Sequence, residues 1–133
     1  PGAKETLSQL MKAATLILAT SADVSDESQI RGALKRVGLD SYIQKVYSFK
    51  NTGLKKSPEF YRYILKDLDA MPEEAVMVGD SFEKDVLAAN EAGLKAIWFN
   101  PKTHENRADK FHQTIHSLSK LIAMFDQLTE HGR

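Results

Sequence analysis

Short apolar runs alternate along the chain with segments in which apolar residues recur every three or four positions. The first pattern is typical of buried strands, and the second is typical of helices that bury one face. Alternation of the two predicts an α/β fold, an open parallel sheet with helices on both of its faces. The strands are expected at Thr15–Thr20, Val46–Phe49, Ala75–Asp80, Ala96–Asn100 and Thr114–His116.

Signals of helix ends accompany the second pattern. Ser57 is expected to cap a helix that has Pro58 at its first position and Glu59 in its first turn, where the helix dipole favours a negative charge. Gly93 is expected to end a helix of small residues. The polar segment 100–113 has no periodicity and is predicted to be a surface loop. The predicted helices have their apolar faces at Leu7–Ala14, Ile30–Val37, Phe60–Leu68, Glu83–Ala92 and Leu118–Leu128.

Length and composition narrow the class of protein. A chain of 133 residues with 42% hydrophobic residues can build one core, so residues 1–133 are expected to form a single domain. Lysine plus arginine equals aspartate plus glutamate at 18 each, so no net charge favours binding to nucleic acid or to an anionic membrane. The absence of cysteine excludes a disulfide framework and a cysteine nucleophile and fits the cytoplasm. No apolar run approaches the roughly 20 residues that span a bilayer.

Polar groups of complementary kinds follow three of the predicted strands. Thr20 and Ser21 follow the first strand. Lys55 and Lys56 come after the second strand, and Asp80 ends the third. The carboxyl ends of parallel strands share one edge of a sheet, where hydroxyls can bind phosphate oxygens, a lysine can neutralise them and a carboxylate can hold magnesium. Each group alone is more typical of a turn, a helix cap or a solvated loop, but their order and spacing favour a phosphoryl site.

Three motifs resemble those of the haloacid dehalogenase (HAD) superfamily, whose members are mainly phosphatases. Val76–Ser81 followed by Asp85 resembles its acidic motif, in which an apolar strand runs into Gly-Asp. Leu16–Thr20 resembles the motif that ends in a phosphate-binding Thr or Ser. Lys55–Tyr61 resembles the motif that places a lysine before an apolar helix. The resemblance covers nearly the whole chain and implies a Rossmann-like, three-layer core domain.

The resemblance also implies a role for each candidate residue. Thr20 would orient the phosphoryl group of a small phosphorylated metabolite, and Lys55 would offset its charge. Asp80 would bind Mg²⁺, and Asp85 would support the ion or the lysine. Lys56 stands where the family often has proline, which leaves open whether Lys55 or Lys56 reaches the phosphate. The Gly-Asp pair favours a phosphatase over a dehalogenase, because dehalogenases often have Ser-Asn there.

The family's nucleophile, the first Asp of an Asp-x-Asp motif after an apolar strand, has no match. The one Asp-x-Asp in the sequence, Asp67-Leu68-Asp69, is predicted to be a solvated helix end, because Leu68 belongs to an apolar helical stripe. Pro1–Leu7 resembles the point at which such chains re-enter the core after a cap domain. We therefore expect these residues to lack the central nucleophile strand and the cap, whether cleaved, omitted or never present, and to be inactive alone. A companion segment or partner chain would fill the gap between the first and third predicted strands, unless the sheet closes differently.

Alternative interpretations accompany this hypothesis. A non-catalytic phosphate- or partner-binding module derived from the same fold would also lack the nucleophile. A signalling receiver domain is disfavoured, because its acidic first strand and phosphoacceptor are absent in the required order. His112 and His116 have the spacing of a helical zinc pair, but their segment is strand-like, so they are predicted to be solvated. Trp98 and Phe99 are predicted to be core residues rather than a platform for a nucleobase.

Overall fold

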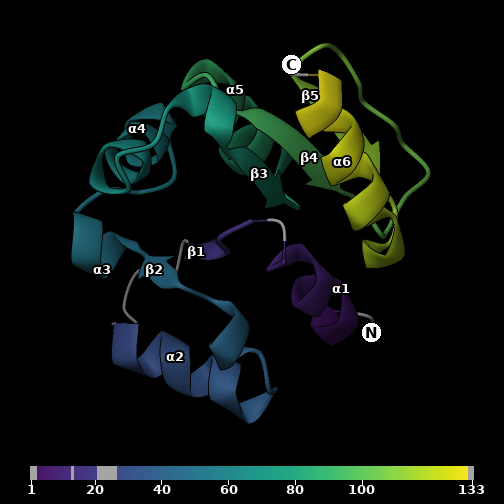
Figure 1. Cartoon of the computed structure of the whole chain (residues 1–133). Helices are drawn as coiled ribbons and strands as arrows, with labels where there is room; N and C mark the ends of the chain where they lie inside the picture. Colours follow the sequence, from purple (N-terminus) through teal and green to yellow (C-terminus); the bar gives the residue numbers. More distant parts are fainter. Residues whose placement is uncertain (1–2, 13, 21–26, 132–133) are drawn as a thin grey trace. The chain divides into compact units, whose positions relative to one another are not determined.

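The computed structural model describes residues 3–12, 14–20 and 27–131. The chain divides into two compact units, Pro1–Lys56 and Ser57–Arg133, and each has a parallel sheet of its own. Helices alternate with the strands, so the predicted α/β fold is confirmed. The first sheet pairs β1 (Ile17–Ala19) with β2 (Lys45–Tyr47), and the second runs in the order β3 (Val76–Gly79), β4 (Lys95–Phe99) and β5 (His112–Ile115) (Figure 1).

In the first unit, the ladder between the two strands extends one step beyond β1. Ala19 lies opposite Tyr47, and the N–H of Thr20 donates to the carbonyl oxygen of Tyr47 at 2.9 Å. Thr20 therefore lies at the carboxyl edge of this sheet. The helices of the unit are α1 (Ala3–Leu10), α2 (Glu27–Arg36), the 3₁₀ turn η1 (Asp40–Tyr42) and α3 (Phe49–Thr52).

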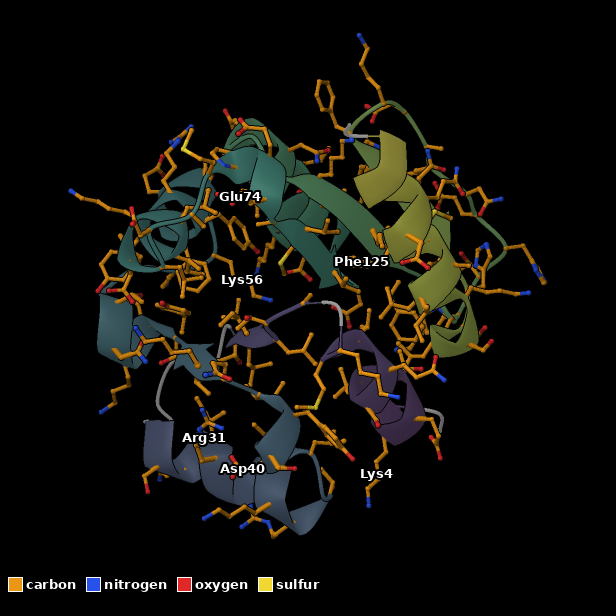
Figure 2. All side chains as sticks on the ribbon, in the orientation of Figure 1. Lys4, Arg31, Asp40, Lys56, Glu74 and Phe125 are labelled. Atoms are coloured by element: carbon orange, nitrogen blue, oxygen red, sulfur yellow. The ribbon has the colours of Figure 1, made fainter. Side chains whose placement is uncertain are left out.

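Arg31 ties α2 to the segment that enters β2 (Figure 2). Its guanidinium donates to the Asp40 carboxylate at 2.9 Å and to the carbonyl oxygens of Ile43 and Gln44 at 2.8 and 3.1 Å. The ion pair is partly exposed, so solvent screens much of its Coulomb energy. The planar fork of donors matters more here, because a single side chain satisfies several carbonyl oxygens at once.

In the second unit, helices cover both faces of the sheet (Figure 1). Successive residues of a strand face opposite sides. Ala96 and Trp98 of β4 pack with Val86 on one face, whereas the Lys95 ammonium donates to the Leu128 carbonyl oxygen on the other at 3.2 Å. The helical segments are α4 (Pro58–Asp67), η2 (Pro72–Glu74), the short π-helix η3 (Phe82–Leu87), α5 (Ala88–Glu91), η4 (Leu118–Lys120) and α6 (Leu121–His131). None of the helices in the described ranges is long and apolar enough to cross a membrane.

Some helix signals in the sequence predicted the structure correctly, and others did not. The N-cap is confirmed, because the Ser57 hydroxyl accepts from the N–H of Phe60 at 3.2 Å. Three positions assigned to apolar helix faces are wrong: Met11 lies past the end of α1 and is 47% exposed, Val37 lies past the end of α2 and is 65% exposed, and Leu68 follows α4 and is 37% exposed. Phe49 was expected to end a strand but begins α3. In each case the helix boundary, which periodicity does not encode, separates the residue from the face it was assigned to.

Candidate functional site

The turn after β3 carries the predicted metal ligand. Asp80 directly follows Gly79, the last residue of β3, and its side chain is exposed. Ser81 then caps the N-terminus of η3, and its hydroxyl accepts from the N–H of Lys84 at 3.2 Å. The strand therefore presents a carboxylate to solvent at the carboxyl edge of the second sheet.

A second carboxylate lies buried beneath this turn. Asp85 is 1% exposed, and its Oδ2 accepts from the N–H of Ser81 at 3.0 Å. A carboxylate that leaves water needs hydrogen bonds to replace its hydration. Gly79 makes room for it, because a Cβ at position 79 would overlap Cβ, Cγ and Oδ2 of Asp85. The glycine is needed for this close approach and not for a left-handed backbone, which it does not adopt.

Tyr61 of α4 contacts the same carboxylate from the other side. Its hydroxyl donates to the carbonyl oxygen of Lys84 at 3.0 Å and lies 3.4 Å from Oδ1 of Asp85. Burial raises the pKa of Tyr61, and the negative charge of Asp85 and their hydrogen bond raise it further. The phenol therefore stays neutral, and it can serve as a donor beneath the turn across the physiological pH range.

Trp98 holds the turn from the neighbouring strand. Its indole N–H donates to the main-chain carbonyl oxygen of Asp80 at 3.0 Å. The ring is 8% exposed, which confirms the prediction that it is a core residue. Neither this contact nor that of Tyr61 was predicted from the sequence, because 18 and 24 residues separate the partners. Only the parallel ladder, which pairs Trp98 with Gly79, could have suggested the first of them.

The other predicted site residues belong to the first unit. Thr20 is half-buried, Lys55 is exposed and Lys56 is half-buried, and Ser21 lies outside the described residues. Both lysines follow α3 and precede α4 in the chain. The structure thus puts Thr20 at the carboxyl edge of one sheet and Asp80 at the carboxyl edge of the other. The convergence of Thr20 and Lys55 with Asp80 stays a prediction.

Local hydrogen bonds shape the turn that leads from β2 to the lysines. The N–H of Ser48 donates to Oδ1 of Asn51 at 2.9 Å, and Nδ2 of the same side chain donates to the carbonyl oxygen of Val46 at 2.8 Å. Gly53 then ends α3 with a φ of 76°, in the left-handed region that glycine adopts without steric cost. One amide side chain thereby closes the turn on both of its sides.

The donor set after β3 fits a hard divalent cation. Magnesium prefers oxygen ligands in an octahedral arrangement and often keeps several waters. Asp80 offers an exposed carboxylate, while the Asp85 oxygens already accept from Ser81 and contact Tyr61. Within the described ranges no three His, Cys, Asp or Glu side chains gather in a way that would hold a metal. Asp80 is therefore the ligand that these residues offer directly, and Asp85 supports the turn that carries it.

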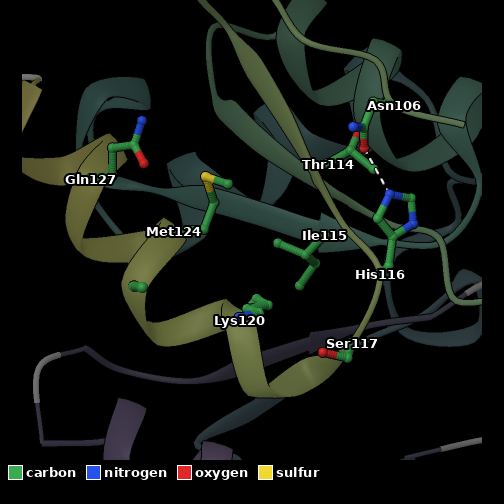
Figure 3. Close-up of a pocket in the computed structure, with 9 residues that line it drawn as sticks. Asn106, Thr114, Ile115, His116, Ser117, Lys120, Met124 and Gln127 are labelled. Carbon is green, nitrogen blue, oxygen red and sulfur yellow. Dashed lines mark hydrogen bonds between the residues drawn. The ribbon is translucent and has the colours of Figure 1, made fainter. Parts of the chain in front are cut away.

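A pocket of about 360 Å³ lies elsewhere in the second unit, between β5 and α6 (Figure 3). None of the predicted site residues lines it. On its rim, Nε2 of His116 lies 2.7 Å from Oδ1 of Asn106, and Nδ1 lies 2.7 Å from the carbonyl oxygen of Asn100. The pocket walls are Asn106, Thr114, Ile115, His116, Ser117, Lys120, Ala123, Met124 and Gln127.

His112, in β5, and His116, directly after it, differ in exposure. His116 is exposed, as expected, but the prediction that His112 is solvated is wrong, because only 7% of it is exposed. Its Nδ1 lies 2.8 Å from Oδ1 of Asn90, and its ring meets that of Phe82 edge to face at 5.1 Å. The strand alternation that turns residue 112 inward was visible in the sequence only once the strand had been placed correctly.

Comparisons with known proteins agree on one family. The family profile described as haloacid dehalogenase-like hydrolase matches residues 1–99. A curated relative, the ribulose-1,5-bisphosphate 5-phosphatase of Halopiger xanaduensis, is 33% identical over 133 residues, which cover 95% of this chain and 55% of the relative. The chain spans about half the length of the curated relatives it matches first.

Solved structures resemble nearly the whole chain. A HAD phosphatase from Thermococcus onnurineus matches with a TM-score of 0.77 and 28% identity, covering 94% of this chain and 57% of that one. A 2-haloacid dehalogenase from Pseudomonas syringae matches with a TM-score of 0.77 and 29% identity, covering 96% and 53% of the two chains. Phosphatases and dehalogenases thus share this fold, so the choice between them depends on the residues of the site.

Proposed function

Because the chain belongs to the haloacid dehalogenase-like hydrolase family, we propose that it supplies the phosphate- and magnesium-binding part of a phosphatase. The observation that carries the proposal is the exposed carboxylate of Asp80, held in a turn over the buried Asp85 at the end of β3. The similarity to a curated phosphatase over 95% of the chain supports it. An acidic turn suits a cation that bridges to phosphate, which a dehalogenase does not need.

The proposed chemistry assigns one task to each residue. The Thr20 hydroxyl and Ser21 bind phosphoryl oxygens, and the Lys55 ammonium offsets their negative charge. Asp80 holds Mg²⁺, which supplies charge neutralisation at the phosphoryl group when bound. An aspartate from outside these 133 residues attacks phosphorus, the alcohol of a small phosphorylated metabolite leaves, and water then hydrolyses the acyl phosphate.

A companion strand that carries this aspartate is part of the proposal. Among the described strands, β1 pairs with β2 alone and β3 pairs with β4 alone, so each has one edge to offer to a further strand. The residues of both strands are apolar apart from Gly79, yet they are only half-buried, whereas the middle of β4 is buried. Half-covered apolar strands with an unpaired edge are suited to accept another strand.

A second candidate function is a non-catalytic phosphate- or partner-binding module. The observation in its favour is the position of the Asp-x-Asp in the sequence. Asp67 ends α4, and Asp69 follows in the left-handed region with a φ of 53°. Both side chains are exposed and lie at the end of a helix, whereas a nucleophile of this family follows a strand.

Reconstitution with a strand-supplying segment tests the two candidates. The 133-residue chain is assayed with p-nitrophenyl phosphate and Mg²⁺, alone and with an apolar strand plus Asp-x-Asp fused before Pro1. We expect no hydrolysis by the chain alone and magnesium-dependent hydrolysis by the fusion. In the fusion, Lys55→Ala should lower kcat about a hundredfold, whereas the matched control Lys56→Ala should do much less.

The assay has two informative contrary outcomes. A well-folded fusion that binds phosphate without hydrolysing it would favour the non-catalytic module. Magnesium-dependent hydrolysis by the 133 residues alone, lost in Asp67→Asn, would overturn the assignment of the nucleophile to another segment.

A further inference from the structure

The peptide bond between Asp80 and Ser81 is held at both of its polar ends. Its carbonyl oxygen, from Asp80, accepts from the indole N–H of Trp98 at 3.0 Å. Its N–H, from Ser81, donates to Oδ2 of Asp85 at 3.0 Å. Because a peptide unit is planar, two hydrogen bonds at opposite ends fix its orientation. They thereby restrict ψ of Asp80 and φ of Ser81, the two dihedrals that flank the plane.

Trp98 itself cannot easily turn away. It lies in β4, which pairs with β3 on one side and β5 on the other. The ring of Phe82 meets the indole edge to face at 5.3 Å, and the Arg107 guanidinium lies 5.2 Å from the indole ring and 4.3 Å from the ring of Phe82. Cation–π and aromatic contacts of this kind favour a single ring orientation.

The loop that brings Arg107 to the indole is hydrogen-bonded to β5. The N–H of Arg107 donates to Oγ1 of Thr114 at 2.9 Å, and that hydroxyl donates to the carbonyl oxygen of Arg107 at 2.7 Å. The guanidinium also pairs with Glu105 at 2.7 Å. Thr114 pairs with Trp98 in the parallel ladder, so the arginine is anchored beside the ring that it covers.

We propose that Trp98 is a positioning residue for Asp80: its indole N–H fixes the Asp80–Ser81 peptide and so aims the carboxylate that binds the cation. The inference rests on the proposed function, because it takes Asp80 to be the magnesium ligand. A carboxylate whose backbone is already oriented loses less conformational freedom when it binds an ion. Asp85 performs the matching task on the N–H side, but Asp85 is also a charge near the ion, whereas Trp98 acts through geometry alone.

Trp98→Phe separates positioning from packing. Phenylalanine keeps an aromatic ring against Phe82 but removes the donor to Asp80. Ile97→Val is the matched control, because it trims the neighbouring, fully buried residue of β4 and touches neither end of the peptide. Each variant of the 133-residue chain is titrated with Mg²⁺ alone, followed by the backbone amide NMR shifts of residues 80–82, and its stability is measured separately in urea.

We expect Trp98→Phe to raise the Mg²⁺ dissociation constant about three- to tenfold, which corresponds to the free energy of one lost neutral hydrogen bond. Ile97→Val should leave the dissociation constant unchanged. Equal dissociation constants for Trp98→Phe and the parent chain would overturn the positioning role, whatever the loss of stability. Asp80→Asn distinguishes the two proposals. If Asp80→Asn binds Mg²⁺ as tightly as the parent chain, the assignment of Asp80 as the magnesium ligand fails. If Asp80→Asn weakens binding and Trp98→Phe does not, only the role of Trp98 fails.

A second readout needs no variant, in case Trp98→Phe does not fold. Trp98 is the one tryptophan in the sequence, so its indole N–H gives a single assignable NMR signal. Saturating Mg²⁺ is expected to shift this signal and to slow its exchange with solvent, because the ion and the indole restrain the same residue. An indole signal that saturating Mg²⁺ leaves unchanged would overturn the proposal.

Discussion

The turns that follow β2 and β3 are both closed by side chains, but those side chains come from different distances along the chain. After β2, Asn51 bonds to Ser48 and Val46, which are three and five residues away. After β3, Trp98 and Tyr61 reach Asp80 and Asp85 across 18 and 24 residues. The first turn is closed by a side chain of its own segment. The second has local hydrogen bonds at Ser81 but is also held by side chains of a distant helix and of the neighbouring strand. A site that needs a fixed carboxylate is thus built on the tertiary contacts of the second unit.

The largest expected effect comes from filling the space beneath the second turn. Gly79→Ala places a Cβ on the Asp85 side chain, and the buried carboxylate has no room to withdraw. We expect a loss of about 3 kcal/mol or more in the free energy of unfolding, or insoluble protein. Urea denaturation followed by circular dichroism measures it.

Gly53→Ala is the control for this substitution. Gly53 ends α3 with a φ of 76°, but a Cβ there would meet no atom within 4 Å. The cost is therefore the backbone strain of a left-handed alanine, about 1 kcal/mol. Similar losses for the two variants would contradict the steric role of Gly79.

Gly93 and Gly79 also show which features could be predicted from the sequence and which could not. A glycine at the end of a predicted helix, such as Gly93, indicates a helix stop from local pattern alone, and the structure agrees, with a φ of 97°. The sequence predicted that Gly79 belongs to an acidic turn. The steric need for a glycine there could not be predicted, because it depends on the position of Asp85, which follows from the π-helical geometry of η3. The parallel α/β fold and the Ser57 cap were predictable because periodicity and capping are local.

The long-range contacts of the site were not predictable from the same signals. Nothing in the composition of the loop before β5 indicates that Arg107 covers Trp98 and Phe82. The packed position of His112 likewise depends on the true start of β5, which precedes the expected start by two residues, at 112 rather than 114. Sequence reasoning therefore found the residues that bear charge at the strand ends but not the side chains that hold those ends in place.

A smaller effect is expected from the Tyr61 phenol of α4, which lies beneath the second turn. Tyr61→Phe removes the donor to the Lys84 carbonyl oxygen and to Asp85, which should cost about 1–2 kcal/mol of stability at neutral pH. It should also change the pH dependence. Because folding raises the pKa of Tyr61, the unfolded chain releases its proton first, and the parent chain loses stability as the pH rises above about 10.

The measurement is urea denaturation at pH 9, 10 and 11. Tyr61→Phe should lose stability less steeply than the parent over this range, because it has no proton to release at position 61. Tyr63, on the same helix but 40% exposed, provides the matched control, and Tyr63→Phe should keep the steep decline. A parent slope that survives in Tyr61→Phe would show that the phenol is not the group whose ionisation opposes folding.

The smallest effect should arise in the locally closed turn. Asn51→Ala removes an acceptor for the Ser48 N–H and a donor to the Val46 carbonyl oxygen, but its own side chain is exposed, so water can replace part of what is lost. We expect a loss of about 1 kcal/mol, compared with almost none for the neighbouring exposed Lys50→Ala. Amide hydrogen exchange tests where the loss falls: protection should fall in residues 48–53 and stay unchanged at Ser81, whose amide depends on Asp85. A loss of protection at Ser81 in Asn51→Ala would show that the two turns are energetically coupled, and the contrast between a local turn and a tertiary one would no longer hold.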